Sequence, residues 1–157
     1  MHEKMNSQKF MTESTDNLLT NNFGSNELDK LVSKLQACPD PRKRYEYLLF
    51  MAKNLPCLPE ESLNPSIKVQ GCISQVYVIG ELENGKLFWK GYSDALITKG
   101  LLSFLIKGLN NLTPQEILEI NPSFITATGL GNSLTPSRVN GFMNIFLMMK
   151  NQACSFL

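Results

Sequence analysis

The chain has 157 residues, of which 43% are hydrophobic and 18% are charged, a size and composition that support one compact domain rather than two. Fifteen basic residues are balanced by fourteen acidic ones, so no net positive field exists to gather nucleic acid or an anionic membrane surface. No run approaches the about 20 apolar residues that a transmembrane helix needs, and we therefore expect neither nucleic acid nor a membrane among the partners.

Residues 1–24 are predicted to form a disordered tail ahead of a single folded domain, residues 25–157. The tail mixes small polar residues with scattered apolar ones at no sustained period, so it buries too little surface to offset the entropy of ordering. It also lacks the apolar run of a signal peptide and the arginines of a transit peptide. We therefore expect a cytoplasmic protein.

Two helices are predicted to follow and to form a helical hairpin. The first begins with Asn26 as its N-cap and ends before Cys38, since apolar residues recur between them at helical spacing. Asp40 is the expected N-cap of the second helix, with Pro41 in its first turn. The residues assigned to the buried faces are Leu28, Leu31, Val32 and Leu35 in the first helix, and Tyr45, Leu48, Leu49 and Ala52 in the second.

A surface loop and a β-hairpin are predicted next. Residues 55–71 contain several prolines, which exclude long regular structure. Two strand-like runs, 73–79 and 86–93, are rich in β-branched and aromatic residues. Asn84 and Gly85 lie between them and are the strongest short-range signal for a two-residue hairpin turn. The two runs are therefore predicted to pair antiparallel.

The rest of the chain is predicted to be helical. Residues 94–107 are apolar nearly all round, as expected for a helix packed centrally against the strands. Thr113 and Glu116 form a capping box, and Thr135 with Pro136 opens the last helix. The residues expected on one face of that helix are Val139, Phe142, Met143, Phe146 and Met149. The predicted class is α+β, with a small antiparallel β-sheet, a hairpin with or without a third strand, packed against several α-helices.

Several common catalytic arrangements lack the residues that they need. The one histidine, His2, falls in the predicted tail, so a cysteine–histidine or serine–histidine pair within the domain is excluded. Gly129 and Gly131 lack the preceding strand and the further glycines of a phosphate-binding loop. The cysteines form neither a Cys-x-x-Cys pair nor a disulfide framework. Free thiols are therefore expected, with no resident metal and no cofactor.

Cys72 differs from Cys38, Cys57 and Cys154 in its position. It follows Gly71 where the proline-containing loop meets a predicted strand, and a glycine there lets another molecule approach the backbone closely. Free cysteines are usually buried, however. Composition alone therefore leaves two interpretations open, a structural Cys72 and a reactive one.

Four short motifs carry a resemblance to a known family. The segment 69–77, VQGCISQVY, closely resembles the persulfide-cysteine motif of the SufE family. The further matches are GYSDA at 91–95, TKGL at 98–101 and LTPSR at 134–138. In this order, over about residues 28–149, they mark the chain as similar to SufE proteins. The departures are mild: Ile73 stands where a polar residue is common, and Tyr77 stands where tryptophan is frequent.

The resemblance implies a SufE-like fold and a sulfur carrier rather than an enzyme. A pyridoxal-phosphate-dependent cysteine desulfurase of the SufS type would donate persulfide sulfur to Cys72 and would be stimulated by doing so. A SufBCD-like scaffold complex would then receive the sulfur for iron–sulfur cluster assembly. The pyridoxal phosphate belongs to the desulfurase, so no cofactor is expected in this chain. The alternative is a non-catalytic adaptor, or a cluster scaffold, in which Cys72 is structural or a ligand.

Residues around Cys72 are predicted to support it or to contact a partner, namely Gly71, Gln75, Asp94, Lys99 and Arg138. An Asn-Gly turn sets a register that places Gln75 opposite Asp94 at the start of the central helix, close to Cys72. The helix N-terminus would favour a thiolate, and the Asp94 carboxylate would oppose it. Arg138 is a candidate counter-charge or partner contact, and a surface salt bridge is the alternative.

Overall fold

The computed structural model describes residues 21–157, so positions 1–20 of the predicted tail lie outside the described residues. This part of the chain forms six α-helices, four short 3-10 helices and one two-stranded antiparallel sheet, which confirms the predicted α+β class. The α-helices are α2 (Asn26–Gln36), α3 (Pro41–Met51), α4 (Leu96–Leu109), α5 (Pro114–Leu118), α6 (Phe124–Ala127) and α7 (Pro136–Cys154). The strands are β1 (Val76–Glu83) and β2 (Lys86–Ser93). The 3-10 helices are η1 (Ala52–Asn54), η2 (Glu60–Ser62), η3 (Pro65–Ile67) and η4 (Leu130–Asn132).

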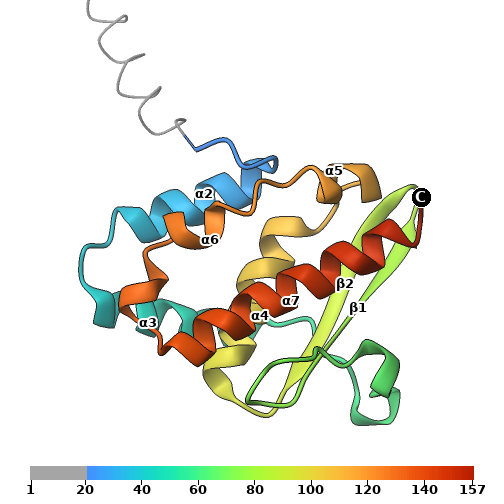
Figure 1. The fold of residues 1–157 in the computed structure, drawn as a ribbon, viewed down its shortest axis with the longest axis horizontal. Helices are drawn as coiled ribbons and strands as arrows, with labels where there is room; N and C mark the ends of the chain where they lie inside the picture. The colour runs from blue at the N-terminus through green and yellow to red at the C-terminus, as the bar shows by residue number, and fades with distance from the viewer. Residues whose placement is uncertain (1–20) are drawn as a thin grey trace, which may run out of the picture.

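Helix α4 forms the centre of the molecule. It lies between the β-hairpin on one side and α2 and α3 on the other, and α7 crosses over it (Figure 1). Most of its residues are buried, as the apolar pattern predicted. Gly100 permits the close crossing of α3, because a Cβ atom at that position would overlap the Leu48 carbonyl oxygen. The helix begins two residues later than predicted, since Asp94 lies in a bend and its backbone N–H bonds the Gln75 carbonyl.

The predicted hairpin and its register are confirmed. Asn84 and Gly85 both have positive φ angles, 53° and 80°, as a type I′ turn requires. Glu83 pairs with Lys86, and the ladder continues to the far end of both strands. The buried face of the hairpin packs towards α4 and α7, and its residues are Val76, Val78, Gly80, Leu87, Trp89, Gly91 and Ser93.

Strand β1 begins at Val76, so the predicted start at Ile73 is wrong. Val76 pairs with Ser93, after which β2 ends and the chain turns into α4, so residues 73–75 have no strand to pair with. A third strand is not formed in the described part of the chain, where an isolated bridge joins Lys68 to Tyr77. The segment that contains Cys72 is consequently a loop.

The start of the domain is more extensively packed than predicted. Ser25, not Asn26, caps α2, because its hydroxyl oxygen accepts the Leu28 N–H at 3.2 Å. Phe23 packs edge-on against Phe124, with 6.3 Å between the ring centroids. The last positions of the predicted tail therefore contact the folded domain.

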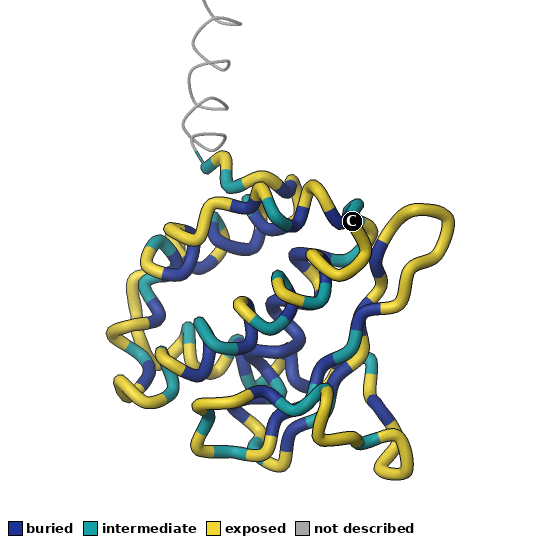
Figure 2. The backbone as a smooth tube through the Cα atoms, turned by 45° about the vertical axis from the view of Figure 1, so that its right-hand side comes forward, coloured by how far each residue is buried: buried dark blue, intermediate teal, exposed yellow. Residues whose placement is uncertain are grey.

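The buried face of α3 is narrower than predicted. In α3, Leu48 is fully buried, whereas Tyr45 is 37% exposed. In α7, Phe142, Phe146 and Met149 are buried, and Val139 and Met143 are half-buried against the core. Buried residues follow the inner sides of the helices and one face of the hairpin, and exposed residues gather at the hairpin turn and in the loops before β1 (Figure 2).

Candidate functional site

Cys72 lies in a loop whose two ends are tied together. The Val69 N–H donates to the Val76 carbonyl at 2.8 Å, so the two ends of the loop of residues 70–75 lie next to each other. The ends of such a loop are fixed by backbone hydrogen bonds, while its middle residues extend from the sheet. Cys72 therefore lies in a loop that projects from the hairpin and is anchored at both ends.

Asp94 closes the second end of the loop. The Gln75 N–H donates to Asp94 Oδ1 at 2.9 Å, and the Asp94 N–H donates to the Gln75 carbonyl at 3.3 Å. Both residues are exposed, and their pairing is the one that the hairpin register predicted. The structure therefore gives Asp94 a positioning role in the loop that carries Cys72.

Gly71 gives the loop a conformation that a side chain would prevent. Its φ angle is 79°, in the left-handed region that favours glycine. A Cβ atom there would also lie 2.6 Å from Nδ2 of Asn144 on α7. That same Nδ2 donates a hydrogen bond of 3.1 Å to the Gly71 carbonyl, which ties the loop to α7 just before Cys72.

A cluster of two hydroxyls and one guanidinium joins the loop to α4 and α7. Arg138, in the first turn of α7, donates from Nη1 to Ser74 Oγ and to Thr98 Oγ1, each at 2.8 Å. The two hydroxyl oxygens are 2.9 Å apart, so the three groups form a closed triangle. Within residues 21–157, Arg138 forms no salt bridge with a carboxylate. We call this triangle the Arg138 cluster.

The sulfur of Cys72 faces α7 rather than solvent. Its Sγ lies 3.8 Å from the Gly141 carbonyl oxygen and borders a small hollow between the loop, α4 and α7, with room for about one water molecule. Burial raises the pKa of the Cys72 thiol, and the positive charge of Arg138 lowers it by a smaller amount. The resting group is therefore a neutral thiol at neutral pH, next to a cation that favours the thiolate.

The other predicted supporting residues have different surroundings. The Asp94 carboxylate does not set the pKa of Cys72 as the sequence predicted, because burial opposes the thiolate and Arg138 supports it. Lys99 is half-buried in α4, and its ammonium has no hydrogen-bond or ion-pair partner in the described part of the chain. Gln75 contributes its backbone, and its side chain is exposed.

The remaining cysteines lie outside this site. Cys38 is half-buried, and Cys57 and Cys154 are exposed. Among the described residues, no three side chains of histidine, cysteine, aspartate or glutamate converge where they could hold a metal ion. No helix in residues 21–157 combines the length and apolar composition that crossing a bilayer requires.

Comparison with known proteins identifies the family. A family model described as SufE, the Fe-S metabolism associated domain, matches residues 29–153. The chain belongs to the SufE family. A SufE-like protein of Synechocystis sp. is 54% identical over 129 residues, which are 82% of this chain and 81% of that protein. The cysteine desulfuration protein SufE of Plasmodium vivax is 40% identical over 83% of this chain and 54% of its own length.

Two further comparisons bear on length and on fold. SufE-like protein 1 of Arabidopsis thaliana, described as chloroplastic or mitochondrial, is 38% identical over 81% of this chain, which spans only 34% of that protein. The solution structure of a hypothetical protein from Thermus thermophilus has a TM-score of 0.72 at 24% identity, covering 83% of this chain and 96% of that one. That likeness supports the SufE-like fold.

Sequence reasoning did not assign roles to several residues of this candidate site. Ser74 and Thr98 stand inside quoted motifs, but only the tertiary structure places their hydroxyls on Arg138. Gly141 and Asn144 stand outside every quoted motif, and nothing in the local pattern pointed to them. Their common feature is a place on the turns of α7 that face the loop.

Proposed function

We propose that Cys72 accepts a sulfur atom as a persulfide from a cysteine desulfurase and passes it to an iron–sulfur cluster assembly scaffold. The observation that carries this proposal is the placement of Cys72, a half-buried thiol in a tied loop beside the charge of Arg138. Relatives from Plasmodium vivax and Plasmodium falciparum that bear the name cysteine desulfuration protein SufE support the same chemistry.

The transfer is a thiol–persulfide exchange. The Cys72 thiolate attacks the outer sulfur of a persulfide on the desulfurase cysteine. A sulfur–sulfur bond forms at Cys72, the sulfur–sulfur bond on the desulfurase breaks, and the desulfurase cysteine leaves as a thiolate. The number of electrons is conserved, so no external oxidant or reductant is needed. Removing the sulfur frees the desulfurase for its next turnover, which is the origin of the stimulation.

The resting geometry protects the thiol before a partner arrives. A neutral, half-buried sulfur reacts slowly with free oxidants, because the thiolate is the reactive form. Two apolar side chains near the loop are exposed and suit contact with a partner: Ile73 is 67% exposed and Leu96, at the start of α4, is 57% exposed. Docking on these residues would turn the loop outward and bring Cys72 to the donor.

In this proposal the chain is an accessory protein and not an enzyme by itself. Its partners are a SufS-like, pyridoxal-phosphate-dependent desulfurase and a SufBCD-like scaffold. The cytoplasm is the proposed location, because its reducing conditions keep thiols free for repeated exchange.

Intact-mass measurement after incubation with a cysteine desulfurase and cysteine tests the proposal. The unmodified chain and the Cys57→Ser control, which removes an exposed thiol, should each gain the mass of sulfur and lose it with a reductant. Cys72→Ser should gain none and should not stimulate the desulfurase.

Other results would point to the alternatives. Sulfur uptake by Cys72→Ser would show that Cys72 is not the acceptor. Stimulation that survives this substitution would indicate an adaptor. A coloured protein that loses its colour to a chelator would indicate a cluster scaffold.

A further inference from the structure

A groove of two hollows lies between α2, α3 and the C-terminal half of α4. The larger hollow has a volume of about 410 Å³ and the smaller about 290 Å³. Lys34 and Tyr47 line both hollows, and the Lys34 ammonium lies 5.1 Å from the centre of the Tyr47 ring, so this pair forms a ridge between them. None of the residues that surround Cys72 lines this surface, which we call the α2–α3 groove.

The larger hollow combines apolar side chains with unused hydrogen-bonding groups. Met51 and Ile106 supply buried apolar surface. Ser103 is only 4% exposed, and its hydroxyl has no hydrogen-bond partner among the described residues. Asn110 Oδ1 accepts the backbone N–H of Trp89 at 2.9 Å, which fixes the Asn110 side-chain amide. The Nδ2 group of Asn110 has no partner in residues 21–157. The Ser103 hydroxyl and the half-buried Asn110 amide are therefore available to hydrogen-bond a ligand in the hollow.

The rim of the groove is cationic. The charged residues that line it are Lys34, Lys43, Arg44 and Lys107, and no carboxylate lines either hollow. Lys53 adds a fifth cation, with its ammonium 6.0 Å from the ring centre of Phe50, which is 58% exposed. None of these cations is in an ion pair with a residue of the described chain. Because the net formal charge of the chain is only +1, this is a local concentration of positive charge.

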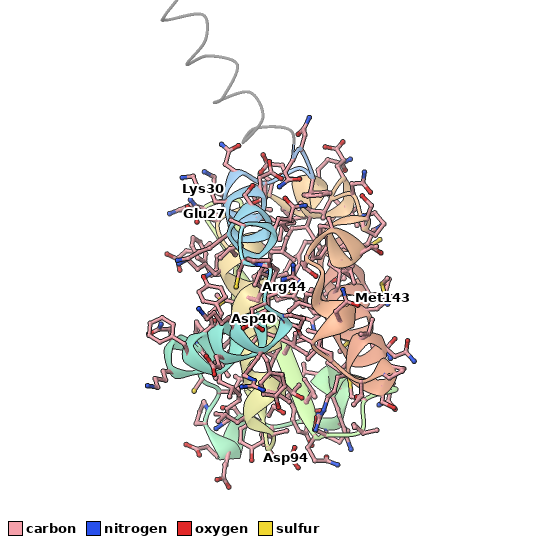
Figure 3. All side chains as sticks on the ribbon, turned by 90° about the vertical axis from the view of Figure 1, so that its left-hand side faces the viewer. Glu27, Lys30, Asp40, Arg44, Asp94 and Met143 are labelled. Carbon is pink, nitrogen blue, oxygen red and sulfur yellow. The ribbon has the colours of Figure 1, made fainter. Side chains whose placement is uncertain are left out.

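The geometry of α4 separates the groove from Cys72. Thr98 and Leu101 line the hollow beside Cys72, whereas Ser103 and Asn110 line the groove. The two residues from Leu101 to Ser103 turn a helix by about 200°, so the two sets face roughly opposite directions. Thr98 and Asn110 are also about 18 Å apart along the axis at 1.5 Å per residue. In Figure 3, Arg44 lies between α2 and α3, well away from Asp94 at the end near the Cys72 loop.

We infer that the α2–α3 groove binds an acidic peptide segment of a partner protein. An aliphatic or aromatic side chain occupies each hollow, and the segment's carboxylates lie against the lysine rim. Two hollows separated by a ridge suit successive side chains of a peptide better than one compact molecule, and the charges are complementary to acidic residues. Since the groove and Cys72 are on different faces of α4, both can be occupied at once. The inference does not depend on sulfur acceptance by Cys72.

Fluorescence anisotropy on the Cys72→Ser chain tests this binding independently of the sulfur chemistry. The probe is a short fluorescein-labelled peptide in which glutamates alternate with leucine and phenylalanine. Charge reversal at the rim, Lys34→Glu or Lys107→Glu, should weaken binding about tenfold. Lys86→Glu at the exposed hairpin turn is the matched control and should leave binding unchanged. Thermal unfolding of each variant confirms that the fold is kept.

Two control peptides separate the two parts of the recognition. Replacing the glutamates by glutamine, or the apolar residues by serine, should each weaken binding, because the groove supplies both a cationic rim and apolar hollows. Amide NMR shifts on addition of the probe should move at Ser103 and Asn110. Alkylation of Cys72 in the unmodified chain should keep the same rate when the probe is bound.

Four results would overturn the inference. They are no binding of the probe, equal loss of binding in Lys86→Glu, equal binding of the serine-substituted peptide, and full competition by heparin at equal charge. The last two would reduce the groove to a general anion-binding surface.

Discussion

Replacing Arg138 by methionine should slow the reaction of Cys72 at neutral pH. The substitution removes the positive charge that lowers the pKa of the thiol and keeps most of the side-chain volume. Ser74 and Thr98 remain hydrogen-bonded to each other at 2.9 Å, so the loop keeps one of its contacts with α4. The burial that raises the pKa then acts without opposition, and the pKa of Cys72 rises further.

The size of the effect follows from the removal of one opposite charge at close range. At a pH below the pKa, the thiolate fraction falls exponentially as the pKa rises, and we expect the alkylation rate at neutral pH to drop about tenfold. Loss of the two charge-assisted hydrogen bonds of 2.8 Å should lower the free energy of unfolding by about 1–3 kcal/mol. Both changes should be measurable in one variant.

The assay is the rate of iodoacetamide modification of Cys72 against pH, with Cys38, Cys57 and Cys154 replaced by serine. Arg138→Lys is the control, because it keeps the charge while it loses the planar fork that bonds both hydroxyls. The rate profile of Arg138→Met should move to higher pH, and that of Arg138→Lys should stay close to the unmodified one. A profile of Arg138→Met that is unmoved, or moved to lower pH, would refute the role of Arg138 as counter-charge.

The same pKa shift makes stability depend on pH. The folded-state pKa of Cys72 is raised above its unfolded value, so the unfolded chain releases the proton first. The stability linked to the neutral thiol is present below the unfolded pKa and is lost as the pH rises through the folded pKa. Arg138→Met should extend this loss to higher pH, and Cys72→Ser should abolish it, as urea unfolding at several pH values would show.

Three further substitutions test the fold around the site. Phe23→Ala should lower the free energy of unfolding by about 1–2 kcal/mol, because it removes the ring contact with Phe124, and an unchanged urea midpoint would contradict that contact. Gly100→Ala should cost about 3 kcal/mol or prevent folding through its clash with α3, whereas Gly131→Ala, with open space around it, should have little effect on the melting temperature. Asp94→Ala should speed Cys72 alkylation at fixed pH, because it loosens the base of the loop. Asp94→Asn keeps an acceptor oxygen and should change the alkylation rate little. Equal rates in the two variants would contradict the positioning role of Asp94.

Local signals predicted the elements that depend on neighbouring residues. The Asn84-Gly85 turn, the Asp40 N-cap and the Thr113 capping box all occur as expected, because each is a backbone geometry set by a few consecutive residues. The register that follows from the turn also holds, and it placed Gln75 beside Asp94. These predictions needed no knowledge of the rest of the fold.

Element boundaries were wrong where a distant partner decides them. Strand β1 starts at Val76 because β2 ends opposite it, at Ser93. Helix α4 starts at Leu96 because the Asp94 backbone is engaged by the loop. The buried face of α3 excludes Tyr45, since the neighbouring elements pack on Leu48 instead. The spacing of hydrophobic residues shows which of them can be buried, and tertiary packing decides which of them are buried.

The sequence by itself determined the α+β class, the helices, the hairpin and Cys72 as the cysteine that a family motif surrounds, because these rest on local pattern and on resemblance. Only the tertiary structure decided the surroundings of that cysteine. Arg138 reaches Ser74 across 64 positions of the chain and Thr98 across 40, and Asn144 reaches Gly71 across 73. No local pattern encodes contacts of this kind, since they exist only once α4, α7 and the loop have packed together. Burial of the Cys72 sulfur and the charge beside it are therefore products of the folded chain.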